Sequence, residues 1–212
     1  MNATRGRPVD IEKQQEQKSK LVAAAVALLR EKSYRSITIR ELAQTAGVNS
    51  ALVAYYFGNK EGLFIGMLDV LAKENFSKMK GVLASPEPIK AFIQAMLSMA
   101  NQNAGTVKMI HDEIMTHDTP LRSAFIERFP KRMAVFLPQL LDHQIQAGLL
   151  DKNINTKYAA FTLIGLIMMP FVAAPIREAA WEITADELKQ PAWADNLYRM
   201  FLTGYGKRET NV

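Results

Sequence analysis

Three histidines and no cysteine limit the reactive chemistry available to this chain of 212 residues. His111-Asp112-Glu113 and His117-Asp118 include the residues best suited to bind a metal ion, because imidazole and carboxylate groups are common zinc ligands. On a helix Glu113 and His117 are neighbours, whereas His111 and His117 lie on different faces, so at most two ligands converge. We therefore interpret these residues as ordinary polar side chains and expect no metal site.

The sequence also lacks a recognisable catalytic set. It has no Gly-x-Ser-x-Gly segment and no glycine loop that would cradle a phosphate, and without cysteine it forms neither a disulfide nor a thiolate zinc site. No apolar segment follows Arg5 and Arg7 at the start of the chain, which argues against a secretory signal. We expect a cytoplasmic protein that is not an enzyme and needs no cofactor.

Three small or branched residues indicate a different chemistry, the recognition of DNA. A helix-turn-helix needs a small residue where its helices cross, a glycine at the turn and a branched apolar residue that anchors the second helix. Ala43, Gly47 and Val53 stand at the required offsets of four and six residues.

The short helix after this turn would present one face outward. Val53 and Phe57 form an i, i+4 buried pair, which leaves Ser50, Ala51, Ala54 and Tyr55 free to enter a major groove. The alternative interpretation is a helical hairpin inside an all-helical protein that makes no contact with DNA.

Local signals define the helices that hold this motif. The segment Thr38–Glu41 matches a capping box, so a helix should begin there and run to about residue 45. Apolar residues with helical spacing predict an earlier helix over residues 18–32, and Asn49 or Ser50 can cap a third helix. Three short helices therefore fit within the first 60 residues.

The net charge of +5 lies entirely in the same segment. Residues 1–60 hold ten Lys or Arg against five Asp or Glu, whereas residues 61–212 hold sixteen of each. A basic excess confined to one part of a chain indicates nucleic acid or a membrane surface as partner, unless the charges only form a solvated face. Together with the helix-turn-helix spacing, it favours DNA.

On two stretches, Ser36–Asn49 and Tyr55–Phe64, the chain resembles the TetR family of bacterial regulators. The resemblance covers about residues 15–66, and beyond them only the total length and the proline-punctuated helical pattern agree. It implies an all-α fold in two domains. These are an N-terminal arm with a three-helix helix-turn-helix DNA-binding domain over residues 1–60, and a helical effector-binding and dimerisation domain over residues 61–212.

The same resemblance implies roles for individual residues. Arg40 would reach a guanine edge or a phosphate, the small residues after the turn would face bases, and the tyrosines and Lys60 would contact phosphate. The arginines of the N-terminal arm would lie in the minor groove. The DNA-binding residues predicted in this way are Arg5, Arg7, Thr38, Arg40, Asn49, Ser50, Ala51, Ala54, Tyr55, Tyr56 and Lys60.

Three residues depart from the family's usual pattern. Leu52 stands where many members have threonine, Ala54 where many have a tyrosine that touches DNA, and Ser33 replaces a common glycine. The first two make the base-reading surface less polar than usual. Specificity would then rely on Arg40, on contacts with thymine methyl groups and on DNA shape.

Beyond residue 60 the apolar spacing predicts helices and no strand. We expect helices over residues 60–83, 89–101, 106–116, 120–148, 156–180 and 186–207. The segment Ser85-Pro86-Glu87-Pro88 should interrupt them. Four prolines should kink the helices that contain them: Pro130, Pro138, Pro170 and Pro175.

Methionine and phenylalanine are frequent in these helices and could line a cavity for an apolar or amphipathic effector. Taken singly, each of them is more typical of a core residue than of a pocket residue. The residues assigned to this effector pocket are Phe92, Met96, Met99, Met109, Met115, Phe125, Phe129 and Met168. We expect the effector to lower DNA affinity by favouring a subunit geometry that misplaces the recognition helices.

The run Tyr158–Ile176 has nineteen residues without a charge and is long enough to cross a membrane. Its two prolines and the amphipathic segment Trp193–Tyr205 favour burial within the domain and against a second chain. In the resembling family the last two long helices form a four-helix bundle with those of a partner. We therefore expect a homodimer, and no membrane partner.

A homodimer also suits the reading of double-stranded DNA, because two recognition helices related by a twofold axis read a palindromic operator. The implied function is a transcriptional repressor that a small effector releases from this operator. A transcription activator, a nucleoid-binding protein and a membrane-associated helical protein are the alternatives.

Overall fold

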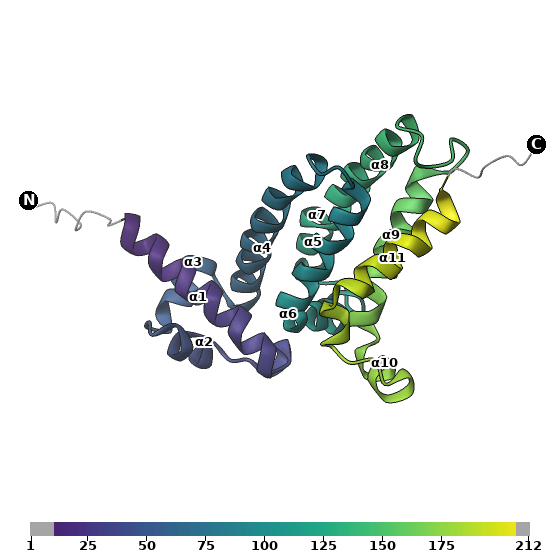
Figure 1. Ribbon diagram of the computed structural model, residues 1–212. Helices are drawn as coiled ribbons and strands as arrows, with labels where there is room; N and C mark the ends of the chain where they lie inside the picture. Colours follow the sequence, from purple (N-terminus) through teal and green to yellow (C-terminus); the bar gives the residue numbers. More distant parts are fainter. Residues whose placement is uncertain (1–10, 207–212) are drawn as a thin grey trace, which may run out of the picture. The chain divides into compact units, whose positions relative to one another are not determined.

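The computed structural model describes residues 11–206, which form helices joined by short turns (Figure 1). Apart from an isolated antiparallel bridge between Leu150 and Gly206, these residues include no β-structure, so the expected all-α fold is confirmed. The helices are α1 (Ile11–Glu31), α2 (Ile39–Ala46), α3 (Ala51–Phe57), α4 (Lys60–Leu83), α5 (Pro88–Gln102), α6 (Ala104–Met109), α7 (Pro120–Arg128), α8 (Pro130–Gln146), α9 (Thr156–Val172), α10 (Ala174–Trp181) and α11 (Pro191–Tyr205). Short turns of other helical types are η1 (Tyr34–Ser36), η2 (Ile110–Ile114) and η3 (Glu187–Lys189).

The chain divides into two compact units, and the division falls within α4, between Met67 and Leu68. The predicted boundary at residue 60 lies seven residues earlier. The first two turns of α4 account for the difference, because Leu63, Phe64 and Met67 are fully buried and belong to the first unit.

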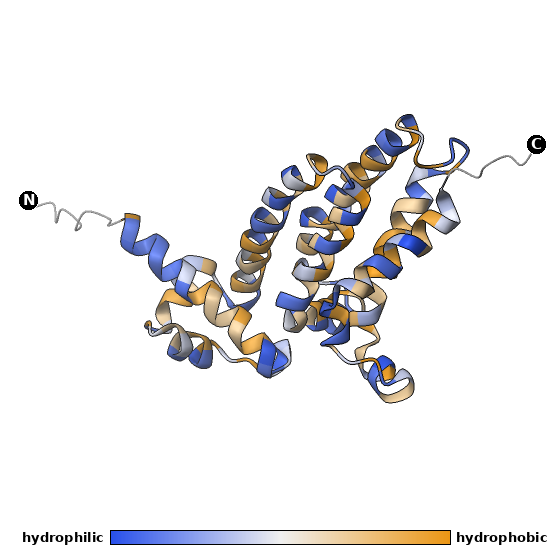
Figure 2. Cartoon of the chain, in the orientation of Figure 1, coloured by the Kyte–Doolittle hydropathy of each residue, from blue (hydrophilic) through white to orange (hydrophobic). Residues whose placement is uncertain are grey.

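The first unit is built around α1, whose buried residues recur with helical spacing. These are Leu21, Val22, Ala24, Ala25, Leu28 and Leu29. The helix begins at Ile11, seven residues before its predicted start. Its first turns are hydrophilic (Figure 2), so they carry no apolar periodicity, but Glu16 and Lys20 form an i, i+4 ion pair of 2.6 Å that supports the helix.

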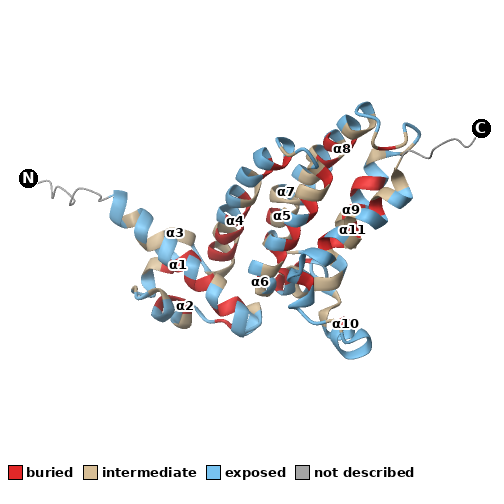
Figure 3. Ribbon diagram, viewed as in Figure 1, coloured by how far each residue is buried: buried red, intermediate tan, exposed pale blue. Residues whose placement is uncertain are grey.

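The second unit has an apolar core to which α5, α8, α9 and α11 contribute. Phe92, Leu141, Leu163 and Phe201, one from each of these helices, are at most 1% exposed. Figure 3 shows buried residues as stripes along α5 and α8, with exposed residues between them. This pattern is the one that burying a single face of each helix requires.

The four prolines expected to kink helices act in two ways. Pro130 and Pro175 stand in the first turns of α8 and α10, where the missing N–H group is not needed. Each thereby divides a helix that the sequence predicted as continuous. Pro138 and Pro170 lie inside α8 and α9, as expected.

The long uncharged run of the sequence is interrupted after α9. At Ala173 the chain bends by 73° into α10, so the run is not one helix. Among residues 11–206 no single helix has the length and apolar character to span a membrane, and only the bent pair of α9 and α10 meets these criteria together.

Candidate nucleic-acid interface

The first turn of α2 is fixed by the reciprocal cap that the sequence predicted. Thr38 Oγ1 accepts a hydrogen bond from the backbone N–H of Glu41 (3.2 Å), and Glu41 Oε2 accepts one from the N–H of Thr38 (2.9 Å). Lys32 Nζ lies 2.5 Å from Glu41 Oε1. Hydrogen bonds from Lys32 and then from Thr38 stabilise the carboxylate and lower the pKa of Glu41 to about 2.

The turn between α2 and α3 depends on glycine. Gly47 has φ = +64°, in the left-handed region that L side chains rarely adopt. The N–H of Val48 donates to Ala43 O (3.0 Å) and the N–H of Gly47 donates to Gln44 O (3.1 Å), which is the double bond pattern of a Schellman cap. This turn sets the direction in which α3 leaves α2.

The short helix α3 buries one residue and exposes the opposite side. Asn49 Oδ1 accepts a hydrogen bond from the N–H of Ala51 (2.8 Å) and so caps the helix, and Val53 is fully buried. Four residues on the outer face are exposed: Ser50, Ala51, Ala54 and Tyr55. The predicted outward orientation of these four residues is confirmed.

Tyr56 is held against α1. Its hydroxyl donates a 2.6 Å hydrogen bond to Gln17 Oε1, and the ammonium of Lys18 lies 5.4 Å from the centroid of its ring. The sequence analysis missed Gln17, because the hydrophilic first turns of α1 gave no signal for a helix. These contacts tie the C-terminal half of α3 to α1 and leave Tyr55, 68% exposed, as the more accessible tyrosine.

Lys60 has a structural role that the sequence did not predict. Its ammonium donates to the carbonyl oxygens of Tyr34 (3.0 Å) and Ile37 (2.9 Å) and lies 4.4 Å from the centroid of the Tyr34 ring. The start of α4 is thereby fastened to the turn before α2. A phosphate contact from Lys60 would have to share the ammonium with these two carbonyls.

Arg40 differs from Lys60 in this respect. It lies in the first turn of α2 and is exposed, and within residues 11–206 its guanidinium makes no hydrogen bond or ion pair. It is therefore available to an anionic partner. The two arginines predicted to act from the N-terminal arm, Arg5 and Arg7, lie outside the described residues.

Two glycines of α4 position α3, and the sequence analysis missed both. A Cβ atom on Gly62 would lie 2.0 Å from the backbone oxygen of Phe57, and one on Gly66 would lie 2.8 Å from the Phe57 ring. Only glycine allows α4 to pass so close to the end of α3. Their spacing of four residues was the available signal, since it places both on one face of a helix.

The residues predicted to line an effector pocket lie in the second unit and are packed to different degrees. Phe92, Met96 and Met109 are buried, whereas Met115 is 69% exposed at the end of η2. Met99, Phe125, Phe129 and Met168 are partly buried, and the rings of Phe125 and Phe129 stack at 5.4 Å between centroids. Met99 and Met168 pack against the core to which Phe92 and Met96 belong, whereas Met115 is open to solvent.

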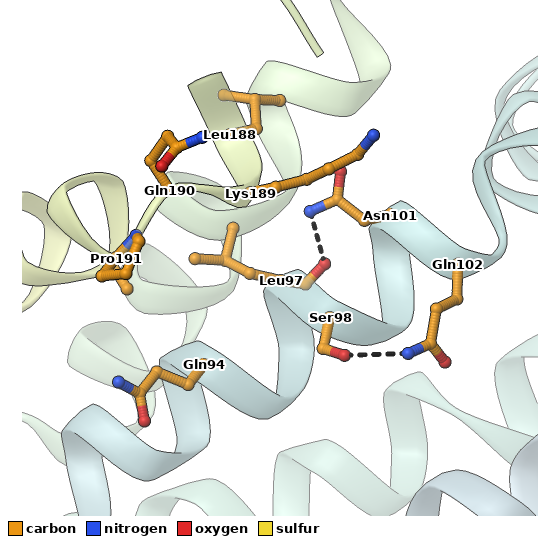
Figure 4. Close-up of a pocket in the computed structure, with 10 residues that line it drawn as sticks. Gln94, Leu97, Ser98, Asn101, Gln102, Leu188, Lys189, Gln190 and Pro191 are labelled. Atoms are coloured by element: carbon orange, nitrogen blue, oxygen red, sulfur yellow. Dashed lines mark hydrogen bonds between the residues drawn. The ribbon is translucent and has the colours of Figure 1, made fainter. Parts of the chain in front are cut away.

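Two open grooves occur elsewhere in the second unit. One of about 480 Å³ has Phe76, Arg132 and Phe136 in its lining, and Arg132 lies 4.5 Å from the centroid of the Phe76 ring. The other, of about 450 Å³, lies between α5 and the turn before α11 (Figure 4). None of the predicted effector residues lines either groove.

The groove beside α5 has an apolar floor and a rim of polar side chains. Leu97, Leu188 and Ala194 form the floor and are at most 5% exposed. On the rim, Asn101 Nδ2 donates to Leu97 O (3.0 Å) and Gln102 Nε2 donates to Ser98 Oγ (3.0 Å), as Figure 4 shows. Two side-chain donors of this rim are thus already used within α5.

The histidines considered as metal ligands lie near the π-helical turn η2. His111 Nδ1 is 3.1 Å from Asp112 Oδ1, and His117 Nδ1 is 2.6 Å from Thr116 Oγ1. Within the described part of the chain, no group of three or more His, Asp or Glu side chains is placed to hold a metal ion.

Comparisons with known proteins agree with this geometry. Residues 21–67 match the family model of bacterial regulatory proteins of the tetR family. The HTH-type transcriptional dual regulator CecR of Shigella flexneri is 31% identical over 157 residues, which cover 71% of this chain and 66% of that relative. The match therefore spans about two thirds of the relative's length.

Solved structures extend the likeness to the second unit. The fatty acid degradation regulator FadR of Bacillus halodurans superposes with a TM-score of 0.75 at 17% identity, over 95% of this chain and 98% of its own. FadR of Bacillus subtilis, solved in complex with stearoyl-CoA, gives 0.74 at 18% identity over 88% and 98% of the two chains. At such low identity these structures show a common fold.

Proposed function

Because this chain belongs to the TetR family of DNA-binding transcriptional regulators, we propose that it is a repressor that binds a palindromic operator in the cytoplasm as a homodimer. One observation carries the proposal. The helix α3 is fixed by the Gly47 turn and the Asn49 cap, buries Val53 completely, and exposes a face of small side chains. Such a face can approach base edges closely in the major groove.

The proposed contacts divide into base reading and phosphate binding. Ser50, Ala51 and Ala54 face the bases, and the methyl groups of the two alanines suit thymine. Arg40 supplies the charged contact, because its guanidinium has no competing partner among residues 11–206. Tyr55 contacts the phosphate backbone from the exposed end of the same face.

The homodimer is supported by exposed apolar side chains on α9 and α11. Tyr158, Phe161 and Met169 of α9 are 60% to 83% exposed, and Met200 of α11 is 51% exposed. An apolar face of this kind is typical of a surface that another chain covers. A seven-residue α3 reads only a few base pairs, so a second copy is also needed for a specific site.

We propose an apolar or amphipathic effector for the second unit. FadR of Bacillus subtilis has a similar fold and was solved with stearoyl-CoA, which is such a molecule. All the methionines and phenylalanines of the predicted pocket except Met115 are buried or partly buried here, so an acyl chain would enter by displacing some of them. Methionine suits this role because its unbranched side chain adapts to new neighbours.

Selection of bound duplexes from a random pool, followed by footprinting, tests the proposal. A discrete palindrome that overlaps a promoter, and whose occupancy falls when stearoyl-CoA is added, is the expected result. Uniform coverage of DNA without a preferred site would contradict a specific regulator.

Activation is the second candidate function. It is favoured by the name of the CecR relative, which describes a dual regulator. In the same footprinting experiment, a protected palindrome upstream of the promoter, with higher transcription when the protein is bound, would indicate activation. Repression predicts a protected palindrome that overlaps the promoter and lower transcription when the protein is bound.

A further inference from the structure

The groove between α4 and α8 combines apolar walls with positive charge. Among the described residues that line it are two cations and no carboxylate. The lining residues are Phe76, Lys131, Arg132, Val135, Phe136 and Gln139. Val135 is 60% exposed, and the two phenylalanines are partly buried. The groove therefore offers an apolar surface and a cation to the same ligand.

Two arginines at this place in the fold differ in their partners. Arg128 is held by Asp69 through two hydrogen bonds, of 2.6 Å from Nε and 3.1 Å from Nη2. Arg132, four residues later, lies 4.5 Å from the centroid of the Phe76 ring, and in the described part of the chain it makes no hydrogen bond or ion pair. Attraction to an aromatic ring leaves the guanidinium without a counter-ion. Arg132 is therefore available to an anion from outside the chain.

The surroundings of the groove add further positive charge. Lys73 and Lys80 are exposed and stand three residues before and four residues after Phe76, on the same side of α4. The ion pair between Lys131 and Glu127 is exposed at both ends, so it holds Lys131 only weakly. A hollow surrounded by charges of one sign raises the local concentration of ligands of the opposite sign. The groove thus favours an anion.

One wall of the groove borders the apolar core of the second unit. The centroid of the Phe136 ring lies 6.2 Å from that of Phe92, which is fully buried. Phe76 and Phe136 both pack against the core cluster. An alkyl chain that displaced the partly buried ring of Phe136 would meet Phe92, one of the residues predicted to line the effector pocket.

We propose that this groove binds the anionic head group of the effector, a carboxylate or a phosphate, with Arg132 as its counter-ion and the alkyl chain along the apolar walls. The inference rests on the effector proposed above, and it adds a charge requirement and a site that none of the predicted pocket residues lines. The volume of about 480 Å³ is within the range of about 300–1,000 Å³ that is usual for small-molecule sites. An anion would give Arg132 the kind of ion pair that Asp69 gives Arg128.

Calorimetric titration with three amphiphiles of equal chain length tests the charge requirement. Decanoate, decyl phosphate and decanol are each added below the concentration at which they aggregate. We expect at least one of the two anions to bind tenfold or more tightly than decanol, because only an anion pairs with Arg132. The anion that binds more tightly identifies the head group. Equal affinity for all three would overturn the head-group site while the proposed apolar effector stands.

Substitutions of groove residues test the location of the site. Arg132→Gln should remove most of the preference for anions, whereas Arg199→Gln, at an exposed arginine of α11 outside the groove, should retain it. Val135→Glu places a carboxylate three residues from Arg132 and should weaken anion binding at least tenfold. Its matched control is Val70→Glu, at a 40% exposed valine of α4 that does not line the groove. Arg132 and Val135 are exposed, so neither change should lower the unfolding midpoint.

Two further outcomes would contradict the inference. A preference for anions that survives both Arg132→Gln and Val135→Glu would place the anion elsewhere and overturn the assignment of the groove. If none of the three amphiphiles binds the unaltered protein, the amphipathic effector proposed for the second unit fails together with this site.

Discussion

The exposed face of α3 in the first unit carries Ser50, Ala51 and Ala54, whereas the exposed face of α9 in the second unit carries Tyr158, Phe161 and Met169. Small side chains on a rigid helix allow close approach to a polar groove, and leaving them in water costs little. Large apolar side chains in water are unfavourable until another apolar surface covers them. The comparison indicates that the two exposed faces suit different partners, a polar groove for α3 and an apolar surface for α9, as the proposed function requires.

The largest effect should follow from a charge placed on the apolar face of the second unit. Phe161 is 83% exposed, so Phe161→Asp should leave the single chain folded but prevent its association. Because each half-site alone binds weakly, operator affinity should then fall about a hundredfold or more. Sedimentation and operator titration measure the two effects, with Leu83→Asp, a matched change at a 52% exposed leucine of α4, as control. A monomer that keeps full operator affinity would contradict the assignment of this face.

The next largest effect should come from Gly62 in the first unit. A Cβ atom there would lie 2.0 Å from the backbone oxygen of Phe57, so Gly62→Ala forces α4 away from α3 and should destabilise the protein by about 2–3 kcal/mol. The matched control is Gly81→Ala in the same helix, where nothing lies within 4 Å and alanine should stabilise by up to about 1 kcal/mol. Urea unfolding measures both. Equal effects of the two changes would refute the close approach of α4 to Phe57.

Substitutions of Arg40 and of Lys60 should change different properties, DNA affinity in the first case and folding stability in the second. Arg40→Ala removes an exposed charge and should weaken operator binding by about 1–3 kcal/mol, reduce the salt dependence by about one counterion, and leave the unfolding midpoint unchanged. Lys60→Gln removes hydrogen bonds to Tyr34 O and Ile37 O and should lower the unfolding midpoint. The two assays are salt-dependent binding and thermal unfolding. The assignment fails if Arg40→Ala lowers stability and leaves binding intact.

The smallest effect concerns the cap of α2 and is visible through its pH dependence. Because the pKa of Glu41 is lowered from 4.5 to about 2, its charged form stabilises the folded state above pH 4.5, and this contribution is lost as the pH falls towards 2. The difference in unfolding midpoint between the unaltered protein and Glu41→Gln should therefore be constant near neutrality and shrink in acid. A difference that grows as the pH falls would mean that folding raises the pKa of Glu41 instead of lowering it, which would contradict the cap geometry.

Structural features that depend only on residues close together in the sequence were predictable from it. The cap of α2 involves residues within a span of four, and the turn after α2 depends on the single residue Gly47. The outward face of α3 follows from the position of Val53. The prolines were predicted less well. Pro130 and Pro175 stand in the first turns of helices instead of kinking them, because a proline in the first turn lacks only an N–H group that the helix does not use there.

Contacts between distant residues were not predictable in the same way. Gln17 on Tyr56, Lys60 on the carbonyls of Tyr34 and Ile37, and Gly62 against Phe57 depend on which helices meet. The hydrophilic start of α1 has no apolar periodicity, so its first helical residues gave no signal.

The amino-acid sequence by itself determined where most helices of the first unit begin and end, where its turn lies and which face of α3 points outward, since these features depend on neighbouring residues and on helical periodicity. Only the tertiary structure decided that Lys60 is held by two carbonyls while Arg40 has no partner within residues 11–206, and that α10 buries Arg177 while it exposes Trp181. The physical reason is that burial and pairing depend on which surfaces folding brings together. Two residues of the same type have the same intrinsic preferences, and their environments differ only because a neighbouring helix packs against one and not against the other.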